Sequence, residues 1–142
     1  MQDIRGSDLP TPAALAYLGD AVHGLLVREM LVARGYAQAG RLHGAAAAYV
    51  TAQAQAVQAE RILPLLTGSE ADLYRRAYNS GHLNRPRHVA VADYRAATGW
   101  EAVLGALWYL GETDRARKLF SRATEEQSEP EEKAGASDGG EI

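Results

Sequence analysis

Residues 12–34 read PAALAYLGDAVHGLLVREMLVAR and predict the first long helix of the chain. Thr11 supplies a capping hydroxyl directly before this segment, and Pro12 occupies the first helical position, where the missing backbone N–H has no helical partner to lose. Gly35 follows the segment and is suited to end a helix. We therefore expect a helix from Pro12 to Arg34.

A second helical pattern covers residues 42–63. Its apolar residues recur every three or four positions until Pro64, which cannot continue a helix. Most of these contact positions are alanine, so neighbouring elements can approach closely, as they would around the central helix of a bundle. The pattern predicts one continuous and central helix.

Three shorter patterns complete the predicted secondary structure. Ser69 and Asp72 resemble a capping box that opens a short helix ending near Gly81. Residues 91–110 read as a long apolar helix closed by a glycine, and residues 114–123 as an amphipathic one. No segment alternates apolar and polar residues as a half-buried strand would, so the fold class is predicted to be all-α.

Composition limits the class of protein. A chain of 142 residues with 46% apolar content supports one ordinary core. The chain has no cysteine, which excludes disulfides and thiolate zinc sites and favours a cytoplasmic location. The first residues carry three charges and no apolar run, unlike a secretory signal. The longest apolar stretch, 96–110, is shorter than the roughly 20 residues that span a bilayer.

Charge divides the chain into three parts. The net charge is −3, but residues 121–142 hold seven acids against Arg122 and Lys133, so the preceding residues carry a small positive excess. The acidic end contains glycine, proline and almost nothing apolar, as disordered segments do. We expect a flexible N-terminus at 1–10, one folded domain at 11–123 and an acidic disordered tail at 124–142.

Two acids stand alone inside apolar helices. Asp20 is the only acid between Pro12 and Val27, and Glu101 is the only charged residue between Arg95 and Glu112. A buried carboxylate is normally paired, bound to a metal or turned to water. Glycine follows each acid four residues later, which leaves room for an ion and a phosphate. The alternative is that each acid faces solvent or pairs with an arginine such as Arg95.

Basic side chains gather around the loop that is predicted to precede the long helix at 91–110. Residues 75–95 hold five arginines and two histidines against one acid, and 79–90 contain Pro86 and the other features of a loop. Clustered arginine suits phosphate contacts, and A-form RNA is gripped mainly through phosphates and 2′-hydroxyls. An ordinary solvated loop is the alternative.

Three motifs give the chain a resemblance to a known family. ALAYLGDAV at 14–22 resembles the ribonuclease III signature, whose core reads F/Y-L-G-D-A/S-V. YRAATGWEAVLG at 94–105 resembles the second acidic motif of that family. RAYN at 76–79, followed by Pro86 and Tyr94, is similar to the pattern of its Mini-III branch. The resemblance covers residues 11–120.

The resemblance implies a ribonuclease III-like catalytic domain that acts as a homodimer, with each active site cutting one strand of double-stranded RNA. It implies that Asp20 and Glu101 are the catalytic and metal-binding residues, with Mg²⁺ as cofactor, since Mg²⁺ prefers oxygen ligands and can activate water near neutral pH. It further implies RNA contacts from Arg76, Asn79, Arg85 and Arg87 and a role in maturation of precursor large-subunit ribosomal RNA. Whether a ribosomal protein presents the RNA is left open.

The apolar signature helix near Tyr17, Leu18 and Val22 is expected to contribute to the dimer interface. Two departures from larger family members bear on the metal site, because Ala16 and Thr98 stand where those enzymes carry additional acids. This predicts weaker metal binding. The competing hypothesis is a non-catalytic, all-α RNA-binding or scaffold protein, which would need neither lone acid.

Overall fold

The first helix begins at the predicted residue and ends one residue before the predicted Arg34. In the computed structural model, which describes residues 8–80 and 85–125, helix α1 spans Pro12–Ala33. The Thr11 hydroxyl accepts a hydrogen bond from the Ala14 N–H at 3.1 Å. Gly35 follows with φ +98°, a conformation that glycine adopts without strain.

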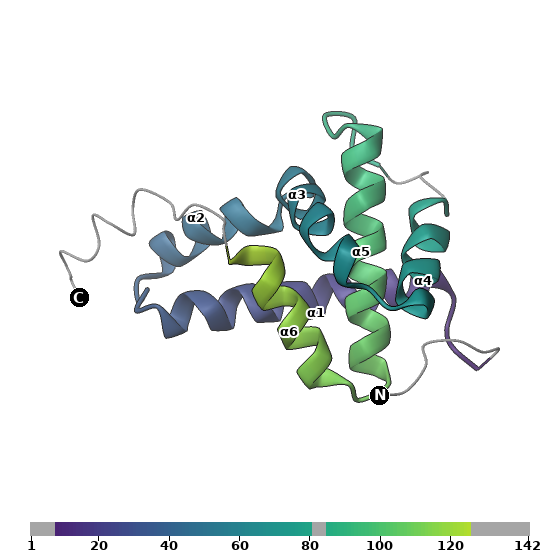
Figure 1. The fold of residues 1–142 in the computed structure, drawn as a ribbon. Helices are drawn as coiled ribbons and strands as arrows, with labels where there is room; N and C mark the ends of the chain where they lie inside the picture. The colour runs from purple at the N-terminus through teal and green to yellow at the C-terminus, as the bar shows by residue number, and fades with distance from the viewer. Residues whose placement is uncertain (1–7, 81–84, 126–142) are drawn as a thin grey trace.

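Five further α-helices follow among the described residues (Figure 1): α2 (Ala39–Val50), α3 (Ala52–Ile62), α4 (Gly68–Tyr78), α5 (Val91–Tyr109) and α6 (Thr113–Thr124). A short 3-10 turn, η1 (Leu63–Leu65), holds Pro64 after α3. No strand occurs in 8–80 or 85–125, so the all-α class is confirmed. The long helix predicted at 91–110 and the amphipathic one at 114–123 are also confirmed, each within one residue.

The prediction of one continuous helix over 42–63 is wrong, because the helix is interrupted at Thr51. This residue has extended backbone (φ −66°, ψ 157°), ending α2 and capping α3. Its hydroxyl accepts a hydrogen bond from the Ala54 N–H at 3.1 Å, which satisfies a free donor of the new helix. The apolar positions remain in phase across the break, so their spacing alone does not reveal it.

The cap of α4 also differs from the prediction. Thr67 and Glu70, not Ser69 and Asp72, form the capping box: each side chain accepts a hydrogen bond from the other residue's backbone N–H. Glu70 is fully buried, and its carboxylate accepts hydrogen bonds from Nε and Nη2 of Arg115 at 3.1 and 2.8 Å. A two-bond ion pair therefore ties the start of α4 to α6.

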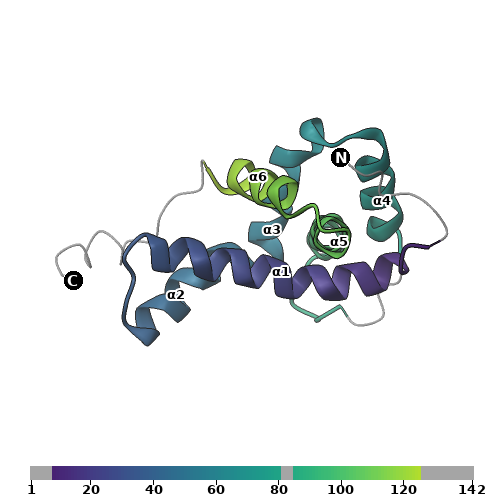
Figure 2. The same ribbon diagram turned by 90° about the horizontal axis from the view of Figure 1, so that it is seen from below.

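The central element is α5 rather than the alanine-rich segment. Figure 2 views α5 almost end-on, with α1, α3, α4 and α6 around it. Trp100, Leu104 and Leu107 of α5 are fully buried in the core. The long apolar run of α5 thus meets neighbours on most sides, as a central helix requires.

The sequence predicts a flexible N-terminus at 1–10 and an acidic disordered tail at 124–142. Residues 1–7 and 126–142, which make up most of both segments, lie outside the described residues. None of the described helices combines the length and the apolar character needed to cross a membrane.

Candidate functional site

Two glycines bring the backbones of α1 and α5 into contact. A Cβ added at Gly19 would lie 1.6 Å from the Glu101 carbonyl oxygen, and one added at Gly105 would lie 1.9 Å from the Leu15 carbonyl oxygen. Only glycine fits at either position. The crossing places Asp20, the residue after Gly19, beside Glu101. The expectation that Gly105 leaves open surface for a ligand is wrong, because it packs against α1.

The two lone acids meet at this crossing. The pKa of Glu101 is raised to about 8, mainly by burial. The negative charge of Asp20 and a hydrogen bond between the two carboxyl groups add to this shift, while a hydrogen bond from Gln55 opposes it. Asp20 itself is exposed. The guanidinium of Arg95, the partner considered for these acids, lies 5.8 Å from the ring centroid of Tyr78. The two carboxyl groups therefore form one site, which we call the acid pair.

The acid pair fits a hard divalent cation. Its donors are all carboxylate oxygens, and a cation bound between them would offset both the burial and the Asp20 charge that raise the Glu101 pKa. Asp20 also borders a hollow of about 360 Å³, to which Gly24 and Arg28 contribute. The space expected beside Asp20 is therefore present. Within the described residues, no cluster of three or more Asp, Glu or His side chains is placed to hold a metal, so an ion here would take its other ligands from water or substrate.

One contact of the acid pair was missed at the sequence level. The side-chain amide of Gln55 in α3 donates a hydrogen bond to Glu101 Oε2 at 3.1 Å. Gln55 is 3% exposed. A signal was present, since Gln55 follows Ala52 by three residues and precedes Ala59 by four, on the contact face of the helical pattern. A polar side chain on such a face needs a partner.

The histidine closest to Asp20 in sequence belongs to the core. His23 is buried, and its Nε2 lies 2.7 Å from Gln58 Oε1, which also accepts a hydrogen bond from Trp100 Nε1 at 3.0 Å. Burial lowers the pKa of His23, so the ring is held neutral. His23 is thus held in the core by Gln58, and it also lines the hollow that Asp20 borders.

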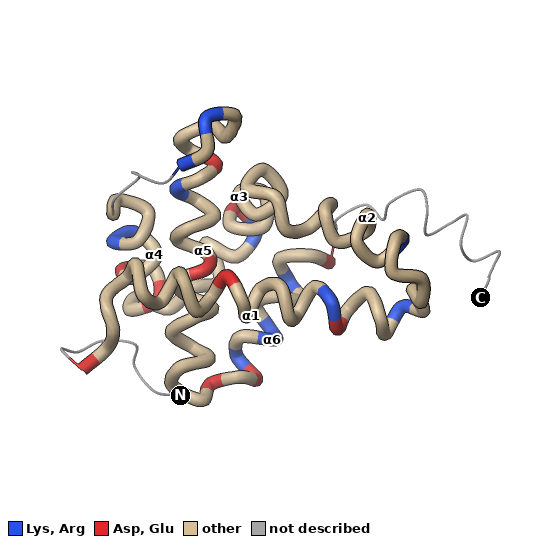
Figure 3. Tube along the Cα trace, turned by 180° about the vertical axis from the view of Figure 1, so that it is seen from behind, with Lys and Arg blue, Asp and Glu red and all other residues tan. Residues whose placement is uncertain are grey.

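The four residues assigned to RNA binding lie on two segments that meet at one end of the molecule. Arg76 and Asn79 are exposed at the end of α4, and Arg76 pairs with Asp72 at 3.0 Å. Arg85 donates a hydrogen bond to the Val89 carbonyl at 2.7 Å, while Arg87 is exposed. Figure 3 shows Lys and Arg positions gathered where α4 stops and α5 starts.

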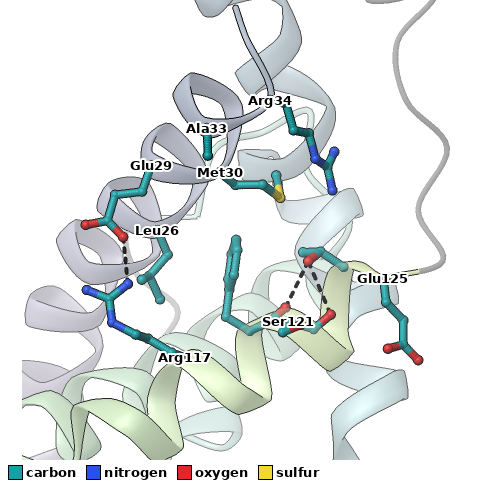
Figure 4. Close-up of a pocket in the computed structure, with 10 residues that line it drawn as sticks. Leu26, Glu29, Met30, Ala33, Arg34, Arg117, Ser121 and Glu125 are labelled. Carbon is teal, nitrogen blue, oxygen red and sulfur yellow. Dashed lines mark hydrogen bonds and ion pairs between the residues drawn. The ribbon is translucent and has the colours of Figure 1, made fainter.

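A separate pocket of about 550 Å³ lies between the second half of α1 and α6 (Figure 4). Leu26 and Met30 line it from α1 and Phe120 from α6, and an ion pair between Glu29 and Arg117 (2.7 Å) crosses one edge. Neither member of the acid pair lines this pocket. The acid pair lies instead beside a hollow at the surface, which suits a large substrate better than an enclosed small molecule.

Comparison with known proteins agrees with this geometry. Residues 13–112 match the model of the ribonuclease III domain family. The chain is 40% identical over 114 residues to Mini-ribonuclease 3 of Symbiobacterium thermophilum, covering 80% of this chain and 88% of that protein. It is also 40% identical to Mini-ribonuclease 3 of a Thermoanaerobacter species, covering 78% of each chain.

A solved structure shows the same fold. The crystal structure of a protein from Fusobacterium nucleatum superposes with a TM-score of 0.74 at 29% identity, covering 88% of this chain and 94% of that one. The family match spans both members of the acid pair and the helices that carry them. This chain therefore belongs to the ribonuclease III family, in its Mini-ribonuclease 3 branch, and is an endoribonuclease of the ribonuclease III type.

Proposed function

We propose that the protein hydrolyses phosphodiester bonds in double-stranded RNA with a Mg²⁺ ion held by Asp20 and Glu101. The observation that carries the proposal is the acid pair itself, formed where the glycine-lined crossing of α1 and α5 joins two acids far apart in sequence. A structural role would not require two carboxyl groups hydrogen-bonded to each other beside a surface hollow. A non-catalytic scaffold would have no use for this arrangement.

When bound, Mg²⁺ would polarise the scissile phosphate and supply hydroxide near neutral pH. Asp20 and Glu101 contribute the negative charge that attracts the ion. Arg28, on the hollow beside Asp20, provides positive charge for the RNA backbone, although its Nη1 also bonds the Gly24 carbonyl at 3.0 Å. Ala16 and Thr98 add no carboxylate, so we expect modest affinity for the ion.

The RNA-binding surface in this proposal consists of Arg76, Asn79, Arg85 and Arg87. Exposed guanidinium groups suit phosphate oxygens, which dominate recognition of duplex RNA. Arg85 has a second role, because its bond to the Val89 carbonyl holds the loop that presents Arg87. All four residues belong to the proposed catalytic domain at 11–123, which would contact the duplex through them.

A homodimer forms part of the same proposal. Along α1, Tyr17 (86% exposed), Leu25 (43%) and Val32 (60%) leave one apolar face open to solvent. These residues are spaced by eight and seven positions, which places them on the same side of a helix. Val22 was expected at the interface as well, but it is 4% exposed and packs in the core of its own chain. An apolar face of this kind commonly marks a protein interface.

The proposed cellular task is maturation of precursor large-subunit ribosomal RNA in the cytoplasm. It is supported by the likeness to Mini-ribonuclease 3 proteins and by the absence of cysteine from the chain.

Incubation of the purified protein with a long RNA duplex tests the proposed activity. We expect cleavage with Mg²⁺ and none with EDTA, and no cleavage of the isolated single strands. A transcript of precursor large-subunit ribosomal RNA, offered under the same conditions, tests the cellular role. Failure to cut any duplex at any Mg²⁺ concentration would contradict the proposed activity.

A further inference from the structure

Gln55 connects the acid pair to the break between α2 and α3. Its Nε2 donates two hydrogen bonds, to Glu101 Oε2 at 3.1 Å and to the Val50 carbonyl at 3.2 Å. Val50 is the last residue of α2, and the extended backbone of Thr51 directs the chain into α3. The amide of Gln55 is thus clamped between a fixed backbone oxygen and a carboxylate of the acid pair.

The side-chain amide of Gln55 points its nitrogen at the Glu101 carboxylate and leaves its own oxygen without a hydrogen bond among the described residues. Gln55 Oε1 is buried and has no hydrogen-bond partner in the described part of the chain. With Glu101 ionised, as it would be when holding a cation, the reversed amide would direct this oxygen at the Glu101 carboxylate and the Val50 carbonyl, leaving three acceptors together without a donor. Because an unsatisfied buried acceptor is costly, the contacts of Nε2 with its two acceptors fix the orientation.

We propose that Gln55 is a positioning residue of the metal site: it holds Glu101 Oε2, so that the carboxylate is presented to a divalent cation shared with Asp20. The inference rests on the proposed function, because it requires the acid pair to bind an ion. Residues that hydrogen-bond a metal ligand tune metal affinity by fixing the orientation of that ligand. With only two protein carboxylates at the site, the orientation of each one matters for binding.

The test is a Gln55→Met variant of the full chain, which removes the donor and keeps the length of the side chain. Calorimetric titration with MgCl₂ or MnCl₂, without RNA, measures the affinity directly. We expect the dissociation constant to rise by about 10-fold or more. The Mg²⁺ concentration for half-maximal duplex cleavage should rise in parallel, and kcat should recover at saturating Mg²⁺.

A matched control separates positioning from packing. The control variant is Gln58→Met. Gln58 is buried on the same helix as Gln55, but its hydrogen bonds are to His23, Trp100 and the Tyr49 carbonyl rather than Glu101. This control should lower the melting temperature and leave metal affinity unchanged. An equal loss of metal affinity in Gln58→Met would show a general packing effect and overturn the inference.

A second variant keeps the inference testable if Gln55→Met does not fold. Gln55→Asn retains an amide but is one methylene too short to reach both acceptors, so it should also weaken metal binding. Unchanged affinity in a folded Gln55 variant overturns the positioning role while leaving the acid pair intact. A wild-type protein that binds neither Mg²⁺ nor Mn²⁺ overturns the proposed metal site itself.

Discussion

Glu101 links the chemistry of the site to the stability of the protein. Burial and the charge of Asp20 raise its pKa from 4.5 to about 8. The unfolded chain therefore releases this proton near pH 4.5, whereas the folded chain without metal retains it up to about pH 8. The stability that comes from the retained proton is fully present below pH 4.5 and is lost as the pH rises through 8.

This linkage predicts that Glu101→Gln removes a pH dependence of stability. In EDTA, wild-type protein should lose at least about 1 kcal/mol more than the variant between pH 5 and pH 8.5, because one pKa unit corresponds to about 1.4 kcal/mol. Urea denaturation at several pH values measures the difference. Parallel stability profiles for the two proteins would show that Glu101 has an ordinary pKa.

At the scale of helices, the contact of α1 with α5 depends on Gly19. Gly19→Ala would place a methyl group 1.6 Å from the Glu101 carbonyl, so the helices must separate. We expect a loss of at least about 2 kcal/mol in the free energy of unfolding, and loss of cleavage as the acid pair is pulled apart. Denaturant unfolding and a duplex cleavage assay measure both effects.

Gly44→Ala is the matched control for this change. Gly44 lies exposed within α2, and a Cβ there would meet no atom within 4 Å. This substitution should stabilise the protein by about 0.5–1 kcal/mol, because alanine loses less backbone entropy in a helix. If both alanine variants behaved alike, the close crossing would not be the feature that forms the site.

The loop before α5 should contribute to RNA affinity through Arg87. Arg87→Ala should weaken binding to unrelated duplexes alike and reduce the slope of log affinity against log salt by about one unit, as expected for one lost phosphate contact. Lys118→Ala, an exposed cation on α6, serves as the control. Loss of one cleavage site with an unchanged salt slope would instead indicate that Arg87 reads a base edge.

Local signals predicted some elements well and others poorly. The first and last residues of α1, α5 and α6 follow from caps, glycines and apolar runs that lie within or next to each helix in the sequence. The break at Thr51 does not, because the apolar positions stay in phase across it. Both Thr67/Glu70 and Ser69/Asp72 fit a capping-box pattern, and the choice depends partly on Arg115, which reaches Glu70 from α6.

Some residues of the site could likewise be predicted from the sequence, and others could not. Asp20 and Glu101 could be nominated because each is a lone acid in an apolar helix. The position of Gln55 on a contact face could also be read from spacing, but its partner Glu101 and the role of Gly105 could not, because both depend on which face α5 turns toward α1 and α3. Sequence spacing carries no information on that rotation without the tertiary contacts.

For the whole molecule, we predict a dimer formed through the exposed face of α1. Light scattering should give twice the 15.3 kDa mass of the chain. Tyr17→Asp with Leu25→Asp should yield a monomer, because charge is introduced into the apolar face. Tyr109→Asp, which alters an exposed aromatic side chain on α5, is the control. A wild-type monomer that makes paired cuts in a duplex would contradict the proposed dimer.

In the proposed mechanism, Mg²⁺-dependent cleavage of duplex RNA requires both Asp20 and Glu101. The most direct measurement compares cleavage rates of wild-type protein, Asp20→Asn and Glu101→Gln on one long duplex, with Glu60→Gln as an exposed-acid control on α3. We predict that both site variants lose cleavage while retaining helical circular dichroism and duplex binding, and that the control cuts like wild type. Near-wild-type cleavage by either folded site variant would show that its carboxylate takes no part in the reaction.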